Sequence, residues 1–196
     1  MGYAVGGIEN LFSKKWKTLR ENPRGVIRKY INLAKLHLFL SNPEVPIFRE
    51  DYSKHWKADF EGKVVLDLGA DYGSTALYFL QKGAGEVIAV EGDRVLAMNL
   101  AKNAKGRRIT PVYGMVTDPK QLDALISVYK PDVVKVDIEG YESILFGSSL
   151  ITAVGEWLVE VHDHAMVGDF VKLFYNFDVE IYRYGDITVI HAVRAV

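Results

Sequence analysis

Acidic residues follow short apolar runs at four places in this sequence, and histidines accompany the last of them. Apolar runs of this length are typical of buried strands, so the acids mark the points where strands end. A carboxylate there can bind a positively charged group or a hydroxyl, and a histidine near its reference pKa can act as a general base. The residues concerned are Asp67, Asp71, Glu91, Asp137, Glu139, His162, Asp163 and His164.

The order of the elements predicts how these residues meet. From about residue 63 onward, apolar runs rich in β-branched residues alternate with helical patterns, which predicts an α/β fold with a mostly parallel sheet and helices on both faces. A final pair of strands joined by Gly185 and Asp186 has the pattern of a tight antiparallel hairpin. Parallel strands are expected at 63–68, 86–91, 109–113, 132–137 and 156–161, and helices at 74–82, 94–104, 119–129, 141–146 and 166–176.

The helix at 119–129 has the clearest start signal, because Asp118 can cap its amides and Pro119 suits its first position. Residues 1–60 are interpreted as an N-terminal helical cap on the same domain, with helices at about 9–21 and 24–40. Residues 61–196 then form the main part of the domain. Residues 1–36 carry eight Lys or Arg against two Glu, a net charge of +6, which we interpret as a solvated helical face.

The loop after the first strand, in VVLDLGADYGSTALYF, contains Gly69 and Gly73, which allow a tight turn and a close approach of backbone to ligand. About 20 residues further on, Glu91 ends the second strand and can accept hydrogen bonds from ribose hydroxyls. This could indicate a dinucleotide, but Asp71 and Ser74 stand at the second and third glycine positions of the dinucleotide fingerprint G-x-G-x-x-G, and a carboxylate beside a pyrophosphate is repelled. Asp67 and Asp71 suit a positively charged ligand, and S-adenosylmethionine carries an ammonium, a sulfonium and a ribose.

Two segments, VVLDLGADYGSTALYFLQKGAGEVIAVEGD and PDVVKVDIEGYESILFG, resemble those of class I S-adenosylmethionine-dependent methyltransferases, and specifically the FkbM family, over about residues 60–165. The resemblance implies a Rossmann-like sheet and an S-adenosyl-L-methionine cofactor. It also implies the site residues: cofactor contacts at Asp67, Gly69, Gly73 and Glu91, with Asp137 near the reacting methyl group. The chain departs from the family pattern at Asp71 and at Glu91-Gly92.

A further departure concerns the adenine. Met115, in the loop after the third strand, stands where related enzymes often place an acid that binds the adenine amino group. We therefore include Met115 in the cofactor site and expect adenine recognition to rest on backbone groups.

The candidate catalytic residues are Asp137, His162 and Glu139, at the ends of the fourth and fifth strands. Carboxylates with histidines could also hold a divalent metal, but the ligand spacing is not that of a known motif, and no metal site is predicted. Lys135 lies on the same strand face as Asp137 and is expected to be its ion-pair partner. Absence of a [DNS]-P-P-[YF] motif and of cysteine favours O-methylation of a small molecule, sugar or glycan, as the family resemblance also implies.

Two alternatives stay open. One is an RNA methyltransferase that docks through the basic N-terminal helices, and the other is a non-catalytic protein that binds the cofactor. The chain has no cysteine, which excludes disulfides and thiolate zinc sites. No signal peptide or membrane span is expected, and the cytoplasm is the expected location.

Overall fold

The computed structural model describes residues 52–185 and 187–195. The chain divides into two compact units, Met1–Arg49 and Glu50–Val196, and the described residues belong to the second. The helices expected at 9–21 and 24–40, and the cap that they would form, lie outside the described residues.

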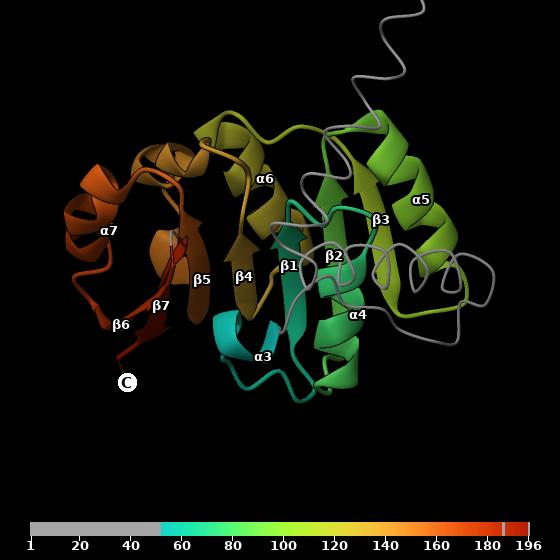
Figure 1. Ribbon diagram of the computed structural model, residues 1–196, viewed down its shortest axis with the longest axis horizontal. Helices are drawn as coiled ribbons and strands as arrows, with labels where there is room; N and C mark the ends of the chain where they lie inside the picture. Colours follow the sequence, from blue (N-terminus) through green and yellow to red (C-terminus); the bar gives the residue numbers. More distant parts are fainter. Residues whose placement is uncertain (1–51, 186, 196) are drawn as a thin grey trace, which may run out of the picture. The chain divides into compact units, whose positions relative to one another are not determined.

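A seven-stranded sheet with the order β3-β2-β1-β4-β5-β7-β6 forms the centre of the described part (Figure 1). The first five strands are parallel, and β7 pairs antiparallel with β5 and β6, as the sequence predicted. Order reverses between β1 and β4, which places the crevice of the sheet at their carboxyl ends. The strands are β1 Val64–Leu68, β2 Glu86–Glu91, β3 Ile109–Tyr113, β4 Val133–Val136, β5 Glu156–Val161, β6 Phe177–Tyr184 and β7 Ile187–Arg194.

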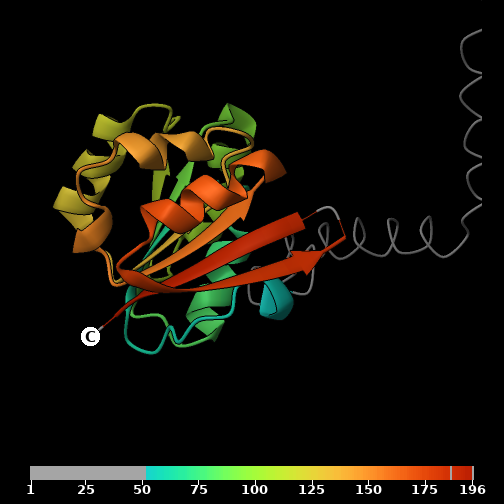
Figure 2. The ribbon, with the colours of Figure 1, turned by 90° about the vertical axis from the view of Figure 1, so that its left-hand side faces the viewer.

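Helices cover both faces of the sheet, as two views at right angles show (Figures 1 and 2). Helices α4 and α5 pack on one face, while α6, α7 and the short 3-10 helices η1 and η2 lie on the other. The helices are α3 Tyr52–His55, α4 Ser74–Gln81, α5 Arg94–Ala104, α6 Pro119–Tyr129 and α7 Val167–Leu173, with η1 Glu142–Gly147, η2 Ile151–Ala153 and η3 His164–Met166.

Local signals account for two of the boundaries that the sequence predicted. The carboxylate of Asp118 accepts a hydrogen bond from the amide of Lys120, and Pro119 is the first residue of α6, which confirms the expected start. Gly185 has a φ of +62° between β6 and β7, as a tight hairpin requires. Asp186 lies outside the described residues.

Two helices differ from expectation. The segment expected as a helix at 141–146 forms the 3-10 helix η1, and the helix expected at 166–176 is shorter, with α7 ending at Leu173. The early end of α7 follows from packing: Phe174 is fully buried and Phe177 nearly so, which turns the chain toward β6 before the helical pattern ends.

The largest apolar cluster lies between the sheet and the α6–α7 layer. Leu66 and Leu68 from β1 and Val134 and Val136 from β4 contribute to it, together with residues of α6 and α7. Trp157 is the largest fully buried side chain, and its indole N–H donates to the carbonyl of Ile151 at 3.1 Å. Within the described residues, no helix combines the length and the hydropathy that crossing a membrane requires.

An ion-pair cluster joins three strands at the amino ends of the parallel strands, at the opposite end of the sheet from the crevice. Glu156, at the start of β5, pairs with Lys63 before β1 at 3.0 Å and with His191 of β7 at 2.7 Å. Burial alone would raise the pKa of the Glu156 carboxyl, but His191 and Lys63 outweigh burial and hold it below its ordinary value of 4.5.

Because the folded pKa is lowered, the ionised Glu156 stabilises the fold above the unfolded pKa, and this contribution is lost as pH falls through the folded pKa. We expect Glu156→Gln to lower the free energy of unfolding by about 1–2 kcal/mol at pH 7, in urea titrations. The difference from the wild type should shrink below about pH 4.5. Asp169→Asn, which removes an exposed pair with Lys172, serves as the control and should leave the free energy of unfolding nearly unchanged. A difference that stays constant down to pH 3 would contradict this assignment.

Candidate cofactor and acceptor site

The loop after β1 is fastened to the end of β2. The amides of Gly69 and Ala70 both donate to the carbonyl of Val90 at 3.0 Å. Farther along the loop, Asp71 has a φ of +54° and Gly73 a φ of +96°, so the chain makes a left-handed turn twice before α4 begins. No side chain caps α4 at Gly73, and its first-turn amides are therefore available to an acceptor group.

Glu91, at the end of β2, holds this loop from the other side. One oxygen accepts from the amide of Asp71 at 2.8 Å, and the other accepts from the amide of Asp93 at 2.7 Å. Each carboxylate oxygen has a second lone pair, so Glu91 can still accept two hydrogen bonds. A ribose with two adjacent hydroxyls could supply both donors.

Gly69 is required by a close approach of two backbone segments. It has a φ of +75°, and a Cβ atom there would lie 1.7 Å from the carbonyl oxygen of Asp137. The amide of Asp137 in turn donates to the carbonyl of Leu68 at 3.2 Å. The end of β4 therefore lies directly against the loop after β1, and no side chain fits between them.

A buried lysine holds these segments together from below. Lys135 of β4 lies opposite Asp67 of β1 in the sheet, and both side chains are fully buried. Its ammonium donates to the carbonyls of Gly69 at 2.8 Å and Leu68 at 3.2 Å. It also lies 3.1 Å from Asp67 and 3.4 Å from Asp137, which confirms the expected pairing with Asp137 and adds a second carboxylate.

These contacts set the charge states of the pair. Burial alone would lower the pKa of the Lys135 ammonium, but the charges of Asp67 and Asp137 outweigh it and raise the pKa. Burial raises the pKa of the Asp67 carboxyl, while Lys135 and the hydroxyl of Thr75, 2.5 Å away, oppose this change. The Oδ1 atom of Asp67 has no hydrogen bond of good geometry, so its contact with Lys135 is an ion pair without alignment. Lys135 is therefore a buried cation surrounded by oxygens of four residues. These are Asp67, Leu68, Gly69 and Asp137.

His162 follows β5 and lies among four carboxylates. We call His162 and these carboxylates, Asp137, Glu139, Glu142 and Glu160, the histidine cluster. Its Nδ1 lies 2.7 Å from Glu142, and its Nε2 faces Glu139 at 3.5 Å, Glu160 at 3.8 Å and Asp137 at 3.9 Å. Burial would lower the pKa of His162, but Glu142, Asp137 and Glu160 together raise it above its ordinary value. The structure thus brings together all three candidate catalytic residues.

Within the histidine cluster, Glu142 fixes the imidazole. Its side chain is 6% exposed, and the same oxygen that pairs with His162 accepts from the amide of Gly140 at 3.0 Å. Because an ionised carboxylate only accepts, Nδ1 carries the proton, and in the neutral ring the lone pair is on Nε2. Glu142 and Glu160 were missed in the sequence, although Glu142 lies two residues after Gly140 in the same motif.

The remaining candidates have mixed placements. Met115 is 62% exposed, and a Cβ atom on Gly92 would lie 2.8 Å from its Cγ atom, so the loops after β2 and β3 touch beside Glu91. Asp163 caps η3 by accepting from Ala165 at 3.0 Å. His164 pairs with Thr188 at 3.0 Å. These last two residues therefore have structural partners away from the histidine cluster.

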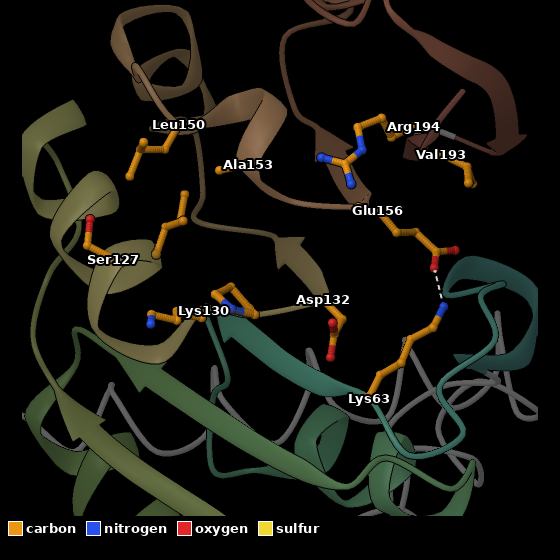
Figure 3. Close-up of a pocket in the computed structure, with 12 residues that line it drawn as sticks. Lys63, Ser127, Lys130, Asp132, Leu150, Ala153, Glu156, Val193 and Arg194 are labelled. Carbon is orange, nitrogen blue, oxygen red and sulfur yellow. Dashed lines mark hydrogen bonds and ion pairs between the residues drawn. The ribbon is translucent and has the colours of Figure 1, made fainter. Parts of the chain in front are cut away.

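A pocket of about 710 Å³ lies at the end of the sheet away from the crevice, between the amino ends of the parallel strands and the end of α6 (Figure 3). Lys63 and Glu156 pair across it, Asp132 accepts from the amide of Val64 at 2.9 Å, and Arg194 donates to the carbonyl of Thr152 at 2.8 Å. Most of its charged groups are thus used within the fold. Despite its size, this pocket is far from Glu91 and the histidine cluster in the sheet, and we do not assign the cofactor to it.

Solved structures define the class of this fold. Fibrillarin of Aeropyrum pernix, in complex with natively bound S-adenosyl-L-methionine, superposes with a TM-score of 0.58 at 18% identity, over 71% of each chain. The precorrin-6y C5,15-methyltransferase of Geobacter metallireducens superposes with a TM-score of 0.56 at 17% identity, over 73% of this chain and 85% of that one. The fold is the Rossmann-like fold of class I S-adenosylmethionine-dependent methyltransferases.

Comparison with known sequences identifies a relative of this chain. It is 30% identical to "Uncharacterized protein 65" of Sulfolobus islandicus filamentous virus over 118 residues, which cover 59% of this chain and 70% of the viral protein. The chain belongs to the same family as this viral protein. No family model matches the chain, and the resemblance to the FkbM family stays a prediction.

A second match covers a smaller region. Over 83 residues the chain is 39% identical to "Probable histone-arginine methyltransferase CARM1" of Oryza sativa subsp. indica, which covers 36% of this chain. The match spans only 15% of the rice protein's length.

The contact between Gly69 and Asp137 can be tested with a matched pair of variants. Gly69 and Gly106 both have a φ of +75°, but a Cβ atom at Gly106 would meet nothing within 4 Å. Gly106→Ala should therefore cost only the backbone strain, about 1–2 kcal/mol in urea unfolding. Gly69→Ala should cost at least about 2 kcal/mol more, because the clash is with backbone. Equal costs would show that the two segments are not held in contact.

Proposed function

We propose that the protein is an S-adenosylmethionine-dependent methyltransferase that methylates a hydroxyl group of a small molecule, sugar or glycan. The observation that carries this proposal is the placement of Glu91, the loop after β1 and the histidine cluster around the point where strand order reverses. In an open α/β sheet this is the position at which ligands bind.

The residues at this point fit the cofactor. Glu91 has two lone pairs left for the ribose hydroxyls, and the uncapped amides at the start of α4 suit a carboxylate. Asp71, in the loop itself, would favour a positively charged group. Met115 would lie beside the adenine, next to Glu91. Asp67 is fully buried, so it would not touch the cofactor directly. It would contribute to the site by pairing with Lys135, which in turn holds the carbonyl of Gly69.

S-adenosylmethionine held by these residues would supply a methyl group from its sulfonium and would leave as the thioether. The task of this chain is then to align the acceptor and to receive the proton of its hydroxyl. Asp137 lies against the loop after β1 and can orient a hydroxyl there. His162 and Glu139 lie within reach of Asp137 and can take up the proton.

Cofactor binding can be tested with two substitutions on the same strand. Glu91→Gln keeps the size of the side chain but turns one acceptor into a donor, and we expect it to weaken binding of S-adenosylhomocysteine at least tenfold by calorimetry. Glu86→Gln, at the other end of β2, should leave binding unchanged. If the wild type does not bind, or if Glu91→Gln binds as tightly, the cofactor site is wrong.

The acceptor can be identified with labelled S-adenosylmethionine and separate pools of sugars, glycolipids and RNA. We expect label in the carbohydrate pools, in an alkali-stable ether. Transfer to RNA, weakened by salt and by neutralising Lys14, Lys15 and Lys17, would favour the RNA alternative instead. Cofactor binding without transfer to any pool would indicate a non-catalytic protein.

A further inference from the structure

We propose that the histidine cluster binds one divalent cation, with Asp137, Glu160 and His162 as its ligands. One oxygen or nitrogen atom from each of these residues lies within 4.8 Å of the other two. They come from the ends of the adjacent strands β4 and β5, which pair in parallel, so the sheet itself fixes their spacing. A set of two carboxylates and one imidazole suits first-row divalent metals such as Mn²⁺.

The imidazole is already oriented as a metal ligand. Glu142 holds the Nδ1 proton at 2.7 Å, so the lone pair of the neutral ring on Nε2 points to Asp137 and Glu160. Histidine ligands of metals characteristically donate their other N–H to a carboxylate in this way. Glu142 is itself nearly buried and fixed by the amide of Gly140, which makes it a supporting residue that positions the ligand.

Asp137 is oriented from the opposite side. Its Oδ2 atom faces the ammonium of Lys135 at 3.4 Å, and its Oδ1 atom faces His162 at 3.9 Å. Because Lys135 fixes one oxygen, the other is presented to the imidazole. Two of the three ligands are thus held by residues that lie behind them in the fold.

Charge also favours a cation here. Four carboxylates, those of Asp137, Glu139, Glu142 and Glu160, lie within 4.0 Å of His162, and Asp137 is the one that also pairs with Lys135. Ionised carboxylates held this close together repel one another. A bound divalent cation would reduce this repulsion, and the partial exposure of its three ligands leaves room for a water or a hydroxyl oxygen.

The use of such a cation in catalysis rests on the proposed function, whereas its binding does not. A hydroxyl bound to the cation would lose its proton more readily, and the exposed Glu139 could receive that proton and pass it to water. In that arrangement His162 serves as a ligand and Glu139 as the proton acceptor.

The experiment is a titration of the full chain with Mn²⁺ alone, followed by electron paramagnetic resonance and calorimetry at pH 7.5. We expect one Mn²⁺ per chain, with nitrogen coupling from an imidazole in the pulsed spectrum. Glu160→Gln and His162→Gln should each weaken binding at least tenfold, and His162→Gln should abolish the nitrogen coupling. Glu142→Gln should weaken binding about tenfold through the orientation of the ring.

Glu180→Gln, an exposed carboxylate on β6, is the matched control and should bind Mn²⁺ as the wild type does. Failure of the wild type to bind Mn²⁺, or unchanged binding in both Glu160→Gln and His162→Gln, would overturn the proposal. Binding of S-adenosylhomocysteine without metal separates the two hypotheses. If S-adenosylhomocysteine binds while Mn²⁺ does not, only the cation site is wrong. If neither binds, the proposed function fails as well.

Discussion

The crevice depends on the contacts that the buried ammonium of Lys135 makes with the oxygens around it. It is fully buried among the parallel strands, and it contacts the carbonyls of Leu68 at the end of β1 and of Gly69 in the following loop, together with two carboxylates. A charge in such a place is tolerated only when it is surrounded by acceptors, so the ammonium dictates where those acceptors lie. The position of Gly69 and the orientation of Asp137 follow from it, and with them the junction between β1 and β4.

The remaining parts of the crevice are held in the same manner, by carboxylates that accept from backbone amides. Glu91 holds the loop after β1 through Asp71, and Glu142 holds the turn after β4 through Gly140. Each of these acids also presents an unused acceptor site or a bound imidazole toward the space above the sheet. One side chain therefore serves both the local backbone and the proposed ligand, which explains how a short chain can build a site with few dedicated residues.

Much of this could be predicted from the sequence, because the information is local. Apolar runs followed by acids gave the parallel strands and their ends, Asp118 with Pro119 marked the start of α6, and Gly185 marked the hairpin. The pairing of Lys135 with Asp137 was also accessible, because residues two apart on a strand share a face.

The contacts between strands were not predictable in this way. The pairing of Lys135 with Asp67 depends on the register of β1 against β4, which no single segment of the sequence records. The burial of Glu142 likewise depends on η1 replacing an expected α-helix, and the nearness of Glu160 to Asp137 depends on the pairing of β4 with β5. The notable residues in the sequence were therefore identified singly, while their assembly into one cluster required the fold.

The double role of Glu142 has a mechanical consequence. The same oxygen atom contacts the imidazole of His162 and the amide of Gly140, so a rotation of the ring breaks a hydrogen bond to the residue that also holds the turn at 138–140. That turn contains Glu139 at a φ of +51°, a left-handed conformation that is uncommon for a non-glycine residue. The ring and the turn are therefore linked through one carboxylate oxygen, so a ligand that binds His162 acts on a residue that also holds the backbone after β4.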